Sequence, residues 1–341
     1  MTKPPYKVPS MAQINAVESN GFRVASTFSG CGGSSLGYRM AGYKVIWANE
    51  FVEAAANTYR ANKSHDCILD TRDIRQVEAA DLPADLDILD GSPPCSSFSM
   101  AGKRAENWGK TKIYSDTKQR TDDLFEQYIR LVKGCQPKVF VAENVTGLVR
   151  GKAKGYFLQI LDQLKSCGYQ VRCKILDAQW LGVPQARQRA IFVGVRNDLG
   201  KVPSFPKPLP YRYSIAEAFD DLDAEVEPEA SIERFAIGKE WHRVGQGGKS
   251  EKYFSLVKPL SSKPSPTITA NCRGTRSIAS VCHPTECRKF SIAELKRLCS
   301  FPDDFKLTGG YTQQYERLGR AVPPLMMRAI AETIKDQILG D

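Results

Sequence analysis

The chain has 341 residues, a mass of 37.9 kDa, a net charge of +10 and a pI of about 9.0. This length suits one large α/β domain with a smaller one, and 42% hydrophobic with 25% charged residues is ordinary for a globular protein. No apolar run is long enough to span a membrane, so we expect no membrane association, whereas the basic charge favours a polyanionic partner.

Strands and helices alternate after a short N-terminal arm, in which Ser10 and Gln13 form a capping box for a first helix. This alternation predicts an α/β fold with a doubly wound, mostly parallel sheet. The expected strands are 23–28, 44–49, 86–89, 138–142, 171–175 and 190–195, and the expected helices are 34–40, 53–62, 121–133 and 156–167.

The amino-acid composition of the chain changes between residues 201 and 287, where prolines cluster and glycine-rich loops are expected. The regular pattern returns at Ser291, which forms a capping box with Glu294, and a last helix follows Pro323-Pro324. We therefore predict an arm (1–22), a discontinuous main domain (23–200 plus 288–341) and a smaller, loop-rich domain (201–287).

Ten cysteines are scattered without a CxxC pair, and residues 1–10 lack the apolar core of a signal peptide. We therefore expect a cytoplasmic protein with free thiols rather than a disulfide framework. Cys272, Cys282, His283 and Cys287 are close in sequence, but their spacing fits no common zinc pattern. No metal site is expected.

The turn Ser29-Gly30-Cys31-Gly32-Gly33 joins the first strand to its helix, and Glu50 ends the second strand. This is the layout of a nucleotide-binding βαβ unit, in which glycines let the backbone approach a ligand and the acid binds ribose hydroxyls. Ser35 replaces the third glycine of the dinucleotide fingerprint. A pyrophosphate cofactor is thus disfavoured, and another adenosine-containing cofactor is left open.

Cys95 follows a buried strand and the turn Gly91-Ser92-Pro93-Pro94. The two prolines fix φ and remove two backbone donors, so the cysteine is held stiffly at a loop mouth. Such a thiol suits a nucleophile, although a cysteine that merely follows a turn is the plain alternative. Cys95, Glu50 and Glu143 all fall at carboxyl ends of strands, where ligands bind in such sheets.

Four short stretches resemble, in type and order, the DNA (cytosine-5) methyltransferase family. They are Phe28-Ser29-Gly30-Cys31-Gly32-Gly33, Pro93-Pro94-Cys95, Glu143-Asn144-Val145 and Gln185-Ala186-Arg187-Gln188-Arg189. The resemblance extends to residues 288–305 and to Leu318-Gly319-Arg320-Ala321-Val322-Pro323-Pro324, and it covers all but the arm and residues 200–287.

The resemblance implies that the Cys95 thiolate adds to C6 of a cytosine and makes C5 nucleophilic toward a sulfonium methyl group. Glu143, whose pKa burial would raise, is implied to act at N3 of the ring. Arg189 is implied to contact the cytosine O2, Arg187 to order the pocket and Asn144 to hold loop backbone. Two residues apart on an extended chain, the arginines should point the same way. Alone, such a pair is more often a solvated or phosphate-binding face.

The implied cofactor is S-adenosylmethionine, with Glu50 on the ribose and Phe51 against the adenine. The other residues implied beside it are Phe28, Gly30, Gly32, Asp73, Ile74, Leu124, Arg320, Ala321 and Val322. Arg320 stands where the family has asparagine, so we hypothesise that it pairs with the carboxylate of carboxy-S-adenosylmethionine, giving 5-carboxymethylcytosine. The alternative is that Arg320 binds a DNA phosphate or a local acid while methyl transfer proceeds.

Double-stranded DNA is the implied partner, and its target base must be flipped out to reach the pocket. Residues 96–120 fit a mobile, basic loop that closes over that base, with an ordinary solvated loop as the alternative. Residues 201–287 would then recognise the target sequence. The implied DNA contacts are Ser96, which replaces the glutamine of most members, and Lys103, Arg104, Thr267, Arg273 and Arg276.

We expect a monomeric bacterial or phage-encoded enzyme, with a cognate restriction endonuclease as an open question. A tRNA cytosine methyltransferase of the same fold stays as an alternative, and the long recognition region argues against it. Intact Cys95, Glu143 and Arg189 argue against a catalytically silent DNA-binding protein. A nicotinamide-dependent oxidoreductase would leave these three residues unexplained.

Overall fold

The computed structural model describes residues 3–94, 112–114, 117–119, 121, 123–149, 154–253, 256–270 and 281–340, with backbone only at 112–114 and 117–119. The chain divides into two compact units. We call residues 15–176, 188–207 and 327–341 the sheet unit, and residues 1–14, 177–187 and 208–326 the loop-rich unit.

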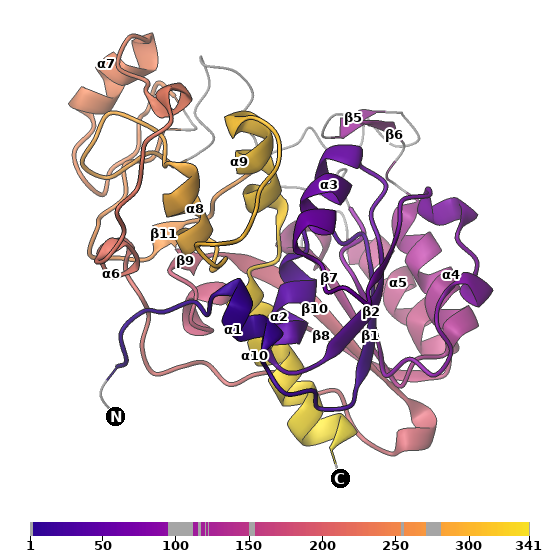
Figure 1. Ribbon diagram of the computed structural model, residues 1–341. Coiled ribbons are helices and arrows are strands. Elements are labelled where there is room, and N and C mark those ends of the chain that lie inside the picture. The colour runs from indigo at the N-terminus through magenta and orange to yellow at the C-terminus, as the bar shows by residue number, and fades with distance from the viewer. Residues whose placement is uncertain are drawn as a thin grey trace. The chain divides into compact units, whose positions relative to one another are not determined.

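The sheet unit is built on a seven-stranded sheet with the order β3-β2-β1-β4-β7-β10-β8 (Figure 1). β1 pairs in parallel with β2 and β4, and β4 pairs in parallel with β7, whereas β10 is antiparallel to β7. The strands are β1 (Arg23–Thr27), β2 (Lys44–Asn49), β3 (Ile68–Asp70), β4 (Ile88–Gly91), β7 (Val139–Val145), β8 (Tyr169–Asp177) and β10 (Gln188–Arg196). The predicted doubly wound, mostly parallel sheet is confirmed.

Helices cover both faces of this sheet, with α4 and α5 on one side and α2 and α10 on the other (Figure 1). The helices of the unit are α2 (Gly33–Met40), α3 (Glu53–Asn62), α4 (Leu124–Cys135), α5 (Lys154–Ser166) and α10 (Pro324–Ile334). Because the central strands are covered on both faces, their side chains are apolar in succession, and all four residues from Val139 to Ala142 are fully buried.

β4 differs from its prediction in a way that matters for the site. The sequence predicts a strand over 86–89, but the strand continues through Asp90 and Gly91, which pair with Ser26 and Thr27 of β1. The apolar pattern stops at Leu89 because the next side chain is an acid, although the backbone pairing does not stop there. Asp90 is therefore buried within the sheet, at 1% exposure.

The loop-rich unit contains short elements joined by long connections. They are α1 (Met11–Asn15), β9 (Gln185–Ala186), α6 (Ile215–Phe219), α7 (Ala236–Arg243), β11 (Ser265–Pro266), α8 (Ile292–Leu298) and α9 (Tyr311–Arg320). Both capping boxes expected from the sequence are present: Gln13 N donates to Ser10 Oγ at 3.2 Å, and Glu294 N donates to Ser291 Oγ at 3.2 Å.

The N-terminal arm packs on the loop-rich unit rather than standing apart. Tyr6 Oη donates to Arg297 O at 2.6 Å, Met11 N donates to Asp304 Oδ1 at 2.9 Å, and Tyr213 Oη donates to Pro4 O at 3.0 Å. α8 and α9 also belong to this unit. The boundaries of the two compact units therefore differ from those of the three predicted domains. The predicted domain boundaries, which concern function, stay a prediction.

Two further observations concern the segment predicted to be a mobile loop and the hydropathy of the helices. Within the segment predicted to be a mobile loop, β5 (Lys112–Tyr114) and β6 (Thr117–Gln119) pair as an antiparallel ribbon. Across the described ranges, no helix combines the length and the hydropathy needed to cross a lipid bilayer.

Candidate active site

The loop after β1 has an unusual backbone that Glu50 holds in place. Phe28, Gly30 and Gly32 have φ values of +51°, +56° and +95°, all in the left-handed region. Gly30 N donates to Glu50 Oε2 and Val52 N donates to Glu50 Oε1, each at 2.7 Å. A non-glycine residue at positive φ costs on the order of 1 kcal/mol and is typical of a functional constraint, which here falls on Phe28.

The groups around this loop fit an adenosine-containing ligand. Phe51 directly follows the buried Glu50 and is 39% exposed, so an aromatic face is available beside an acid. Among the described residues other than its two chain neighbours, none has an atom within 4 Å of a Cβ built on Gly30, so there is open space beside the glycine loop. An aromatic face can pack on a purine, and an acid at the end of β2 can bind a ribose.

Three other predicted cofactor residues lie in the structure around η1 (Ile74–Gln76). Asp73 accepts a hydrogen bond from Arg75 N at 3.0 Å, and Arg75 also pairs with Asp73 at 2.9 Å and with Asp123 at 2.6 Å. Ile74 and Leu124 are only 3% and 2% exposed. The Asp73 carboxylate thus caps its own turn, and the two apolar side chains belong to the core of the sheet unit.

The structure pairs two of the predicted catalytic residues. Glu143 lies near the carboxyl end of β7, and Arg189 lies on the neighbouring antiparallel strand β10, opposite Val145. The Nε atom of Arg189 is 2.7 Å from Glu143 Oε1, and the two side chains are 14% and 10% exposed. A carboxylate and a guanidinium are therefore held side by side, largely shielded from water, at the edge of the sheet where ligands bind.

Asn144, the next residue along β7, holds the loop that leads to Cys95. Its Nδ2 donates to Pro93 O at 3.1 Å, and its Oδ1 accepts a hydrogen bond from Val145 N at 2.8 Å. The amide thereby ties the end of β7 to the backbone two residues before the predicted nucleophile. Four predicted site residues lie outside the described residues at this point: Cys95, Ser96, Lys103 and Arg104.

Asp90 is an acid in this region that the sequence reasoning missed. It accepts hydrogen bonds from Ser26 Oγ at 3.0 Å and from Tyr38 Oη at 3.4 Å. Burial raises the pKa of Asp90 to about 7; the nearby Glu143 raises it as well, while hydrogen bonds from hydroxyl groups such as those of Ser26 and Tyr38 lower it. An acid directly after the apolar run that ends at Ile88 and Leu89 was the sequence signal that could have identified it.

Arg187, in the loop-rich unit, is buried at 1% exposure and binds backbone carbonyl groups. Its Nη1 donates to Ile268 O at 3.0 Å, and its Nη2 donates to Gly319 O at 3.0 Å. A Cβ on Gly319 would lie 2.5 Å from Thr269 O, so glycine permits the close approach of α9 that this arrangement needs. Arg187 thus joins α9 to the segment around Ile268.

The two arginines therefore have different partners, although they are two residues apart in sequence. Arg187 lies between the end of β9 at Ala186 and the start of β10 at Gln188, outside either strand, so the alternation of an extended chain does not carry through it. The expectation of one shared arginine face does not describe this arrangement. Arg187 binds carbonyl groups of the loop-rich unit, whereas Arg189 pairs with Glu143.

The remaining predicted residues of the loop-rich unit also have internal contacts. Thr267 Oγ1 donates to Ala186 O at 2.6 Å. Arg320 pairs with Glu316, four residues earlier on α9, through Nε at 2.8 Å and Nη2 at 2.7 Å. Ala321 caps the end of α9, and Val322 is 4% exposed. Arg273 and Arg276 lie outside the described residues.

Comparison with known proteins identifies the family. Residues 22–336 match the profile of the C-5 cytosine-specific DNA methylases. The chain belongs to this family. Membership makes the protein a DNA (cytosine-5) methyltransferase, and the family generally uses S-adenosylmethionine to methylate DNA. It excludes the nicotinamide-dependent oxidoreductase.

Several curated members of the family are similar along nearly their whole length. The type II methyltransferase M1.HphI of Haemophilus parahaemolyticus is 33% identical over 332 residues, covering 90% of this chain and 85% of that protein. The type II methyltransferase M.NgoFVII of Neisseria gonorrhoeae is 33% identical over 346 residues, covering 93% and 87%. The type II methyltransferase M.Bsp6I of Bacillus sp. strain RFL6 is 33% identical over 336 residues, covering 93% and 99%.

Solved structures share the fold at lower identity. A putative DNA modification methyltransferase encoded within an E. coli prophage superposes with a TM-score of 0.73 at 20% identity, covering 94% of this chain and all of that one. DNMT2 of Spodoptera frugiperda superposes with a TM-score of 0.66 at 19% identity, covering 92% and 99%. The sheet unit thus has the fold of an S-adenosylmethionine-dependent methyltransferase.

Proposed function

We propose that this enzyme methylates C5 of a cytosine flipped out of a specific duplex DNA sequence, through a covalent bond between Cys95 and C6 of the base. The observation that carries the proposal is at the end of β7, where Glu143 pairs with Arg189 and Asn144 holds the backbone at Pro93. These contacts bring an acid and a base-binding cation to the segment that delivers the thiol.

The addition step requires charge stabilisation on the cytosine ring. When the Cys95 thiolate bonds to C6, the electron pair of the C5–C6 bond is delocalised toward N3 and O2 of the ring. Arg189 donates a hydrogen bond at O2, and Glu143 donates its proton at N3, so C5 becomes an enamine carbon. After C5 has taken the methyl group, water removes the C5 proton, the Cys95 thiolate leaves as the C5–C6 double bond re-forms, and N3 returns its proton to the Glu143 carboxylate.

The cofactor residues act by binding and orientation. S-adenosylmethionine, when bound, supplies the electrophilic methyl group. The two backbone N–H groups that donate to Glu50 fix its carboxylate at the end of β2, the position from which an acid binds a ribose hydroxyl. Phe51 offers its exposed ring to the adenine. The backbone at Gly30, bordered by open space, lines the same region.

We propose methyl rather than carboxymethyl as the transferred group. Arg320 has an anionic partner of its own in Glu316, at 2.7 Å and one helical turn away. A carboxylated cofactor would have to displace this partner in order to pair with Arg320. This ion pair therefore favours the alternative in which Arg320 binds a local acid over the hypothesis that Arg320 selects a carboxylated cofactor.

Duplex DNA is the proposed substrate, with Thr267 and the basic residues Lys103, Arg104, Arg273 and Arg276 as proposed contacts. The relatives are named type II methyltransferases, so we propose that this enzyme also modifies one short sequence. We further propose that it acts as a monomer. Sequencing the methylation pattern of DNA from cells that express the gene would identify the target.

The test is transfer of labelled methyl from S-adenosylmethionine to duplex DNA and, in parallel, to tRNA, followed by mass spectrometry of the nucleosides. We expect 5-methylcytosine in DNA only, and a covalent complex with duplexes that contain 5-fluorocytosine. Cys95→Ser should abolish both, with Cys173→Ser as a matched control. Equal activity of Cys95→Ser and the parent enzyme would overturn the mechanism, and modification of tRNA alone would overturn the substrate.

A further inference from the structure

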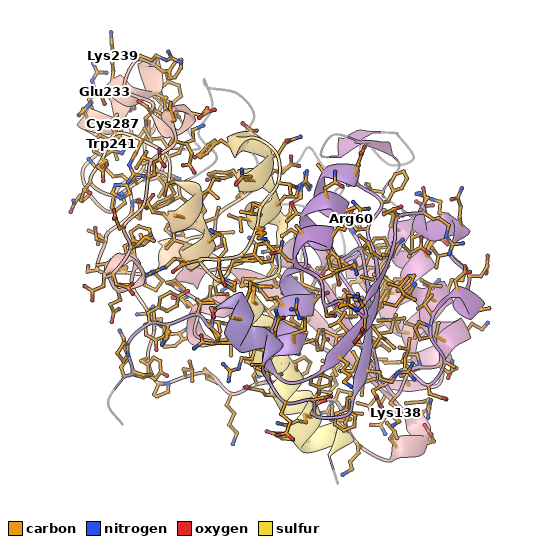
Figure 2. The ribbon with its side chains drawn as sticks, viewed as in Figure 1. Arg60, Lys138, Glu233, Lys239, Trp241 and Cys287 are labelled. Carbon is orange, nitrogen blue, oxygen red and sulfur yellow. The ribbon has the colours of Figure 1, made fainter. Side chains whose placement is uncertain are left out.

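The loop-rich unit contains a cluster of metal-binding groups that has no part in the proposed mechanism. The side chains of Glu233, His242 and Cys287 each present a ligand atom, and these three atoms lie within 4.8 Å of one another. Figure 2 shows Glu233 and Cys287 close together beside Trp241. His242 Nε2 is 2.8 Å from Glu233 Oε1, so an imidazole and a carboxylate are already in contact.

Close packing of the backbone holds the segments that carry Glu233, His242 and Cys287 near one another. Ile232 N donates to Cys287 O at 3.3 Å, which joins the turn carrying the acid to the segment carrying the thiol. Trp241 Nε1 donates to His283 O at 3.3 Å and so links α7 to the segment that carries Cys287. A Cβ on Gly238 would lie 2.3 Å from Ile232 O, so only glycine allows α7 to pack this close to the turn.

The mixture of donor atoms indicates which ion would bind. A thiolate sulfur, an imidazole nitrogen and a carboxylate oxygen together suit Zn²⁺, whereas Mg²⁺ and Ca²⁺ prefer oxygen ligands alone. Zinc–ligand bonds of about 2.0–2.3 Å place tetrahedral donors roughly 3.3–3.6 Å apart. The observed separations are close enough for side-chain rotation to bring Glu233, His242 and Cys287 into that geometry.

We propose that Glu233, His242 and Cys287 bind one Zn²⁺ ion, with water as the fourth ligand. Binding forms a Zn–S bond and releases the thiol proton of Cys287 to solvent, without any change of oxidation state. Of the four residues that are close in sequence, only Cys287 is a proposed ligand. Cys282 is buried and donates to Val257 O at 3.1 Å, His283 contacts Glu294 at 3.4 Å, and Cys272 lies outside the described residues.

A structural role follows from where the ligands lie in the chain. Glu233 precedes α7 and His242 lies in its last turn, while Cys287 is 45 residues beyond His242, so one ion would join two separate segments. In the described part of this unit, the neighbouring apolar cluster has a small buried centre: Ile232, Ile237, Trp241, Leu256 and Cys282. So small a core gains from a metal cross-link. Zinc would therefore stabilise this part of the loop-rich unit without entering the reaction.

Cobalt substitution in the full-length protein, first stripped of metal with a chelator, tests the proposal. We expect one Co²⁺ per chain, with a thiolate-to-cobalt band in the near ultraviolet and intense visible bands that indicate tetrahedral geometry. Zn²⁺ should displace Co²⁺ and raise the thermal midpoint of unfolding. Cys287→Ser should remove the ultraviolet band, with Cys173→Ser as the control, and His242→Gln should weaken binding at least tenfold, with His65→Gln as the control.

Glu233→Gln and His242→Gln change exposed side chains, so these variants keep the proposal testable if Cys287→Ser does not fold. The absence of a thiolate band in the parent protein would overturn the site. So would a band that persists unchanged in Cys287→Ser, or affinity unchanged in both exposed variants. Because the readout is metal binding and unfolding, its outcome is independent of methyl transfer.

Discussion

Replacing Asp90 with asparagine should remove a pH dependence from the stability of the sheet unit. The carboxyl group is buried between β1 and α2, where it accepts hydrogen bonds from Ser26 and Tyr38. Burial raises its pKa from 3.8 to about 7. Below the unfolded pKa the group is neutral in both states, and its contribution to stability is complete. As the pH rises toward 7, the unfolded chain loses this proton first, so the folded state becomes progressively less favoured.

The size of the effect follows from the shift in pKa. A rise from 3.8 to about 7 corresponds to at most ~4 kcal/mol, at ~1.4 kcal/mol per unit, and the full loss is reached above pH 7. Between pH 5 and pH 8, this linkage accounts for roughly 2–3 kcal/mol. Asparagine cannot ionise, and the hydroxyls of Ser26 and Tyr38 can rotate to meet its amide, so Asp90→Asn should lack this component.

Urea unfolding at pH 5, 6, 7 and 8, followed by tryptophan fluorescence, measures the effect, because Trp47 lies in the core of the sheet unit. The free energy of unfolding of Asp90→Asn minus that of the parent should rise by roughly 2–3 kcal/mol from pH 5 to pH 8. Asp66→Asn is the control, since the side chain of Asp66 is 93% exposed. A difference that stays constant across this range would refute the assignment of Asp90 as a buried acid that ionises near neutral pH.

Three other substitutions follow from the site geometry. Glu143→Gln keeps the shape of the side chain but removes its proton-donating carboxyl, so kcat should fall by about 10²-fold or more with binding of DNA retained; unchanged kcat would contradict the role. Arg187→Met leaves the carbonyls of Ile268 and Gly319 without their donor and should cost roughly 2–5 kcal/mol in urea unfolding, which an unaltered midpoint would disprove. Arg320→Asn should yield the same 5-methylcytosine product as the parent by nucleoside mass spectrometry. If the parent formed 5-carboxymethylcytosine from carboxy-S-adenosylmethionine and the variant did not, the hypothesis that Arg320 pairs with the cofactor carboxylate would be supported instead.

Local patterns were enough to predict most elements of the sheet unit. The strand over 44–49 and the helix over 53–62 have the predicted bounds, and both capping boxes form with the predicted partners. These features depend on residues within one or two turns of each other, so their signals lie close together in sequence. α7 and α9 were not predicted, because the polar, proline-rich and glycine-rich surroundings hid their apolar faces.

Site chemistry was predictable only as far as residue type and order allowed. The blocks that resemble the family placed Glu143, Asn144 and Arg189 in one functional set, and the structure pairs Glu143 with Arg189 while Asn144 holds Pro93. The separation of Arg187 from Arg189 was not predictable from their spacing. It arises because β9 ends just before Arg187 and β10 begins just after it, and these bounds depend on pairing with β11 and β7, both distant in sequence.

The order of short motifs by itself determined the family and the class of reaction, and the alternation of strand and helix patterns determined the doubly wound sheet, because each depends on residue types and on periodicity along the chain. Tertiary structure alone decided that Asp90 is buried with a raised pKa, that Arg320 pairs with Glu316, and that Cys287 lies beside a histidine and a glutamate. Burial, ion pairing and metal-ligand geometry arise from contacts between distant segments, and no local pattern records which segments will meet.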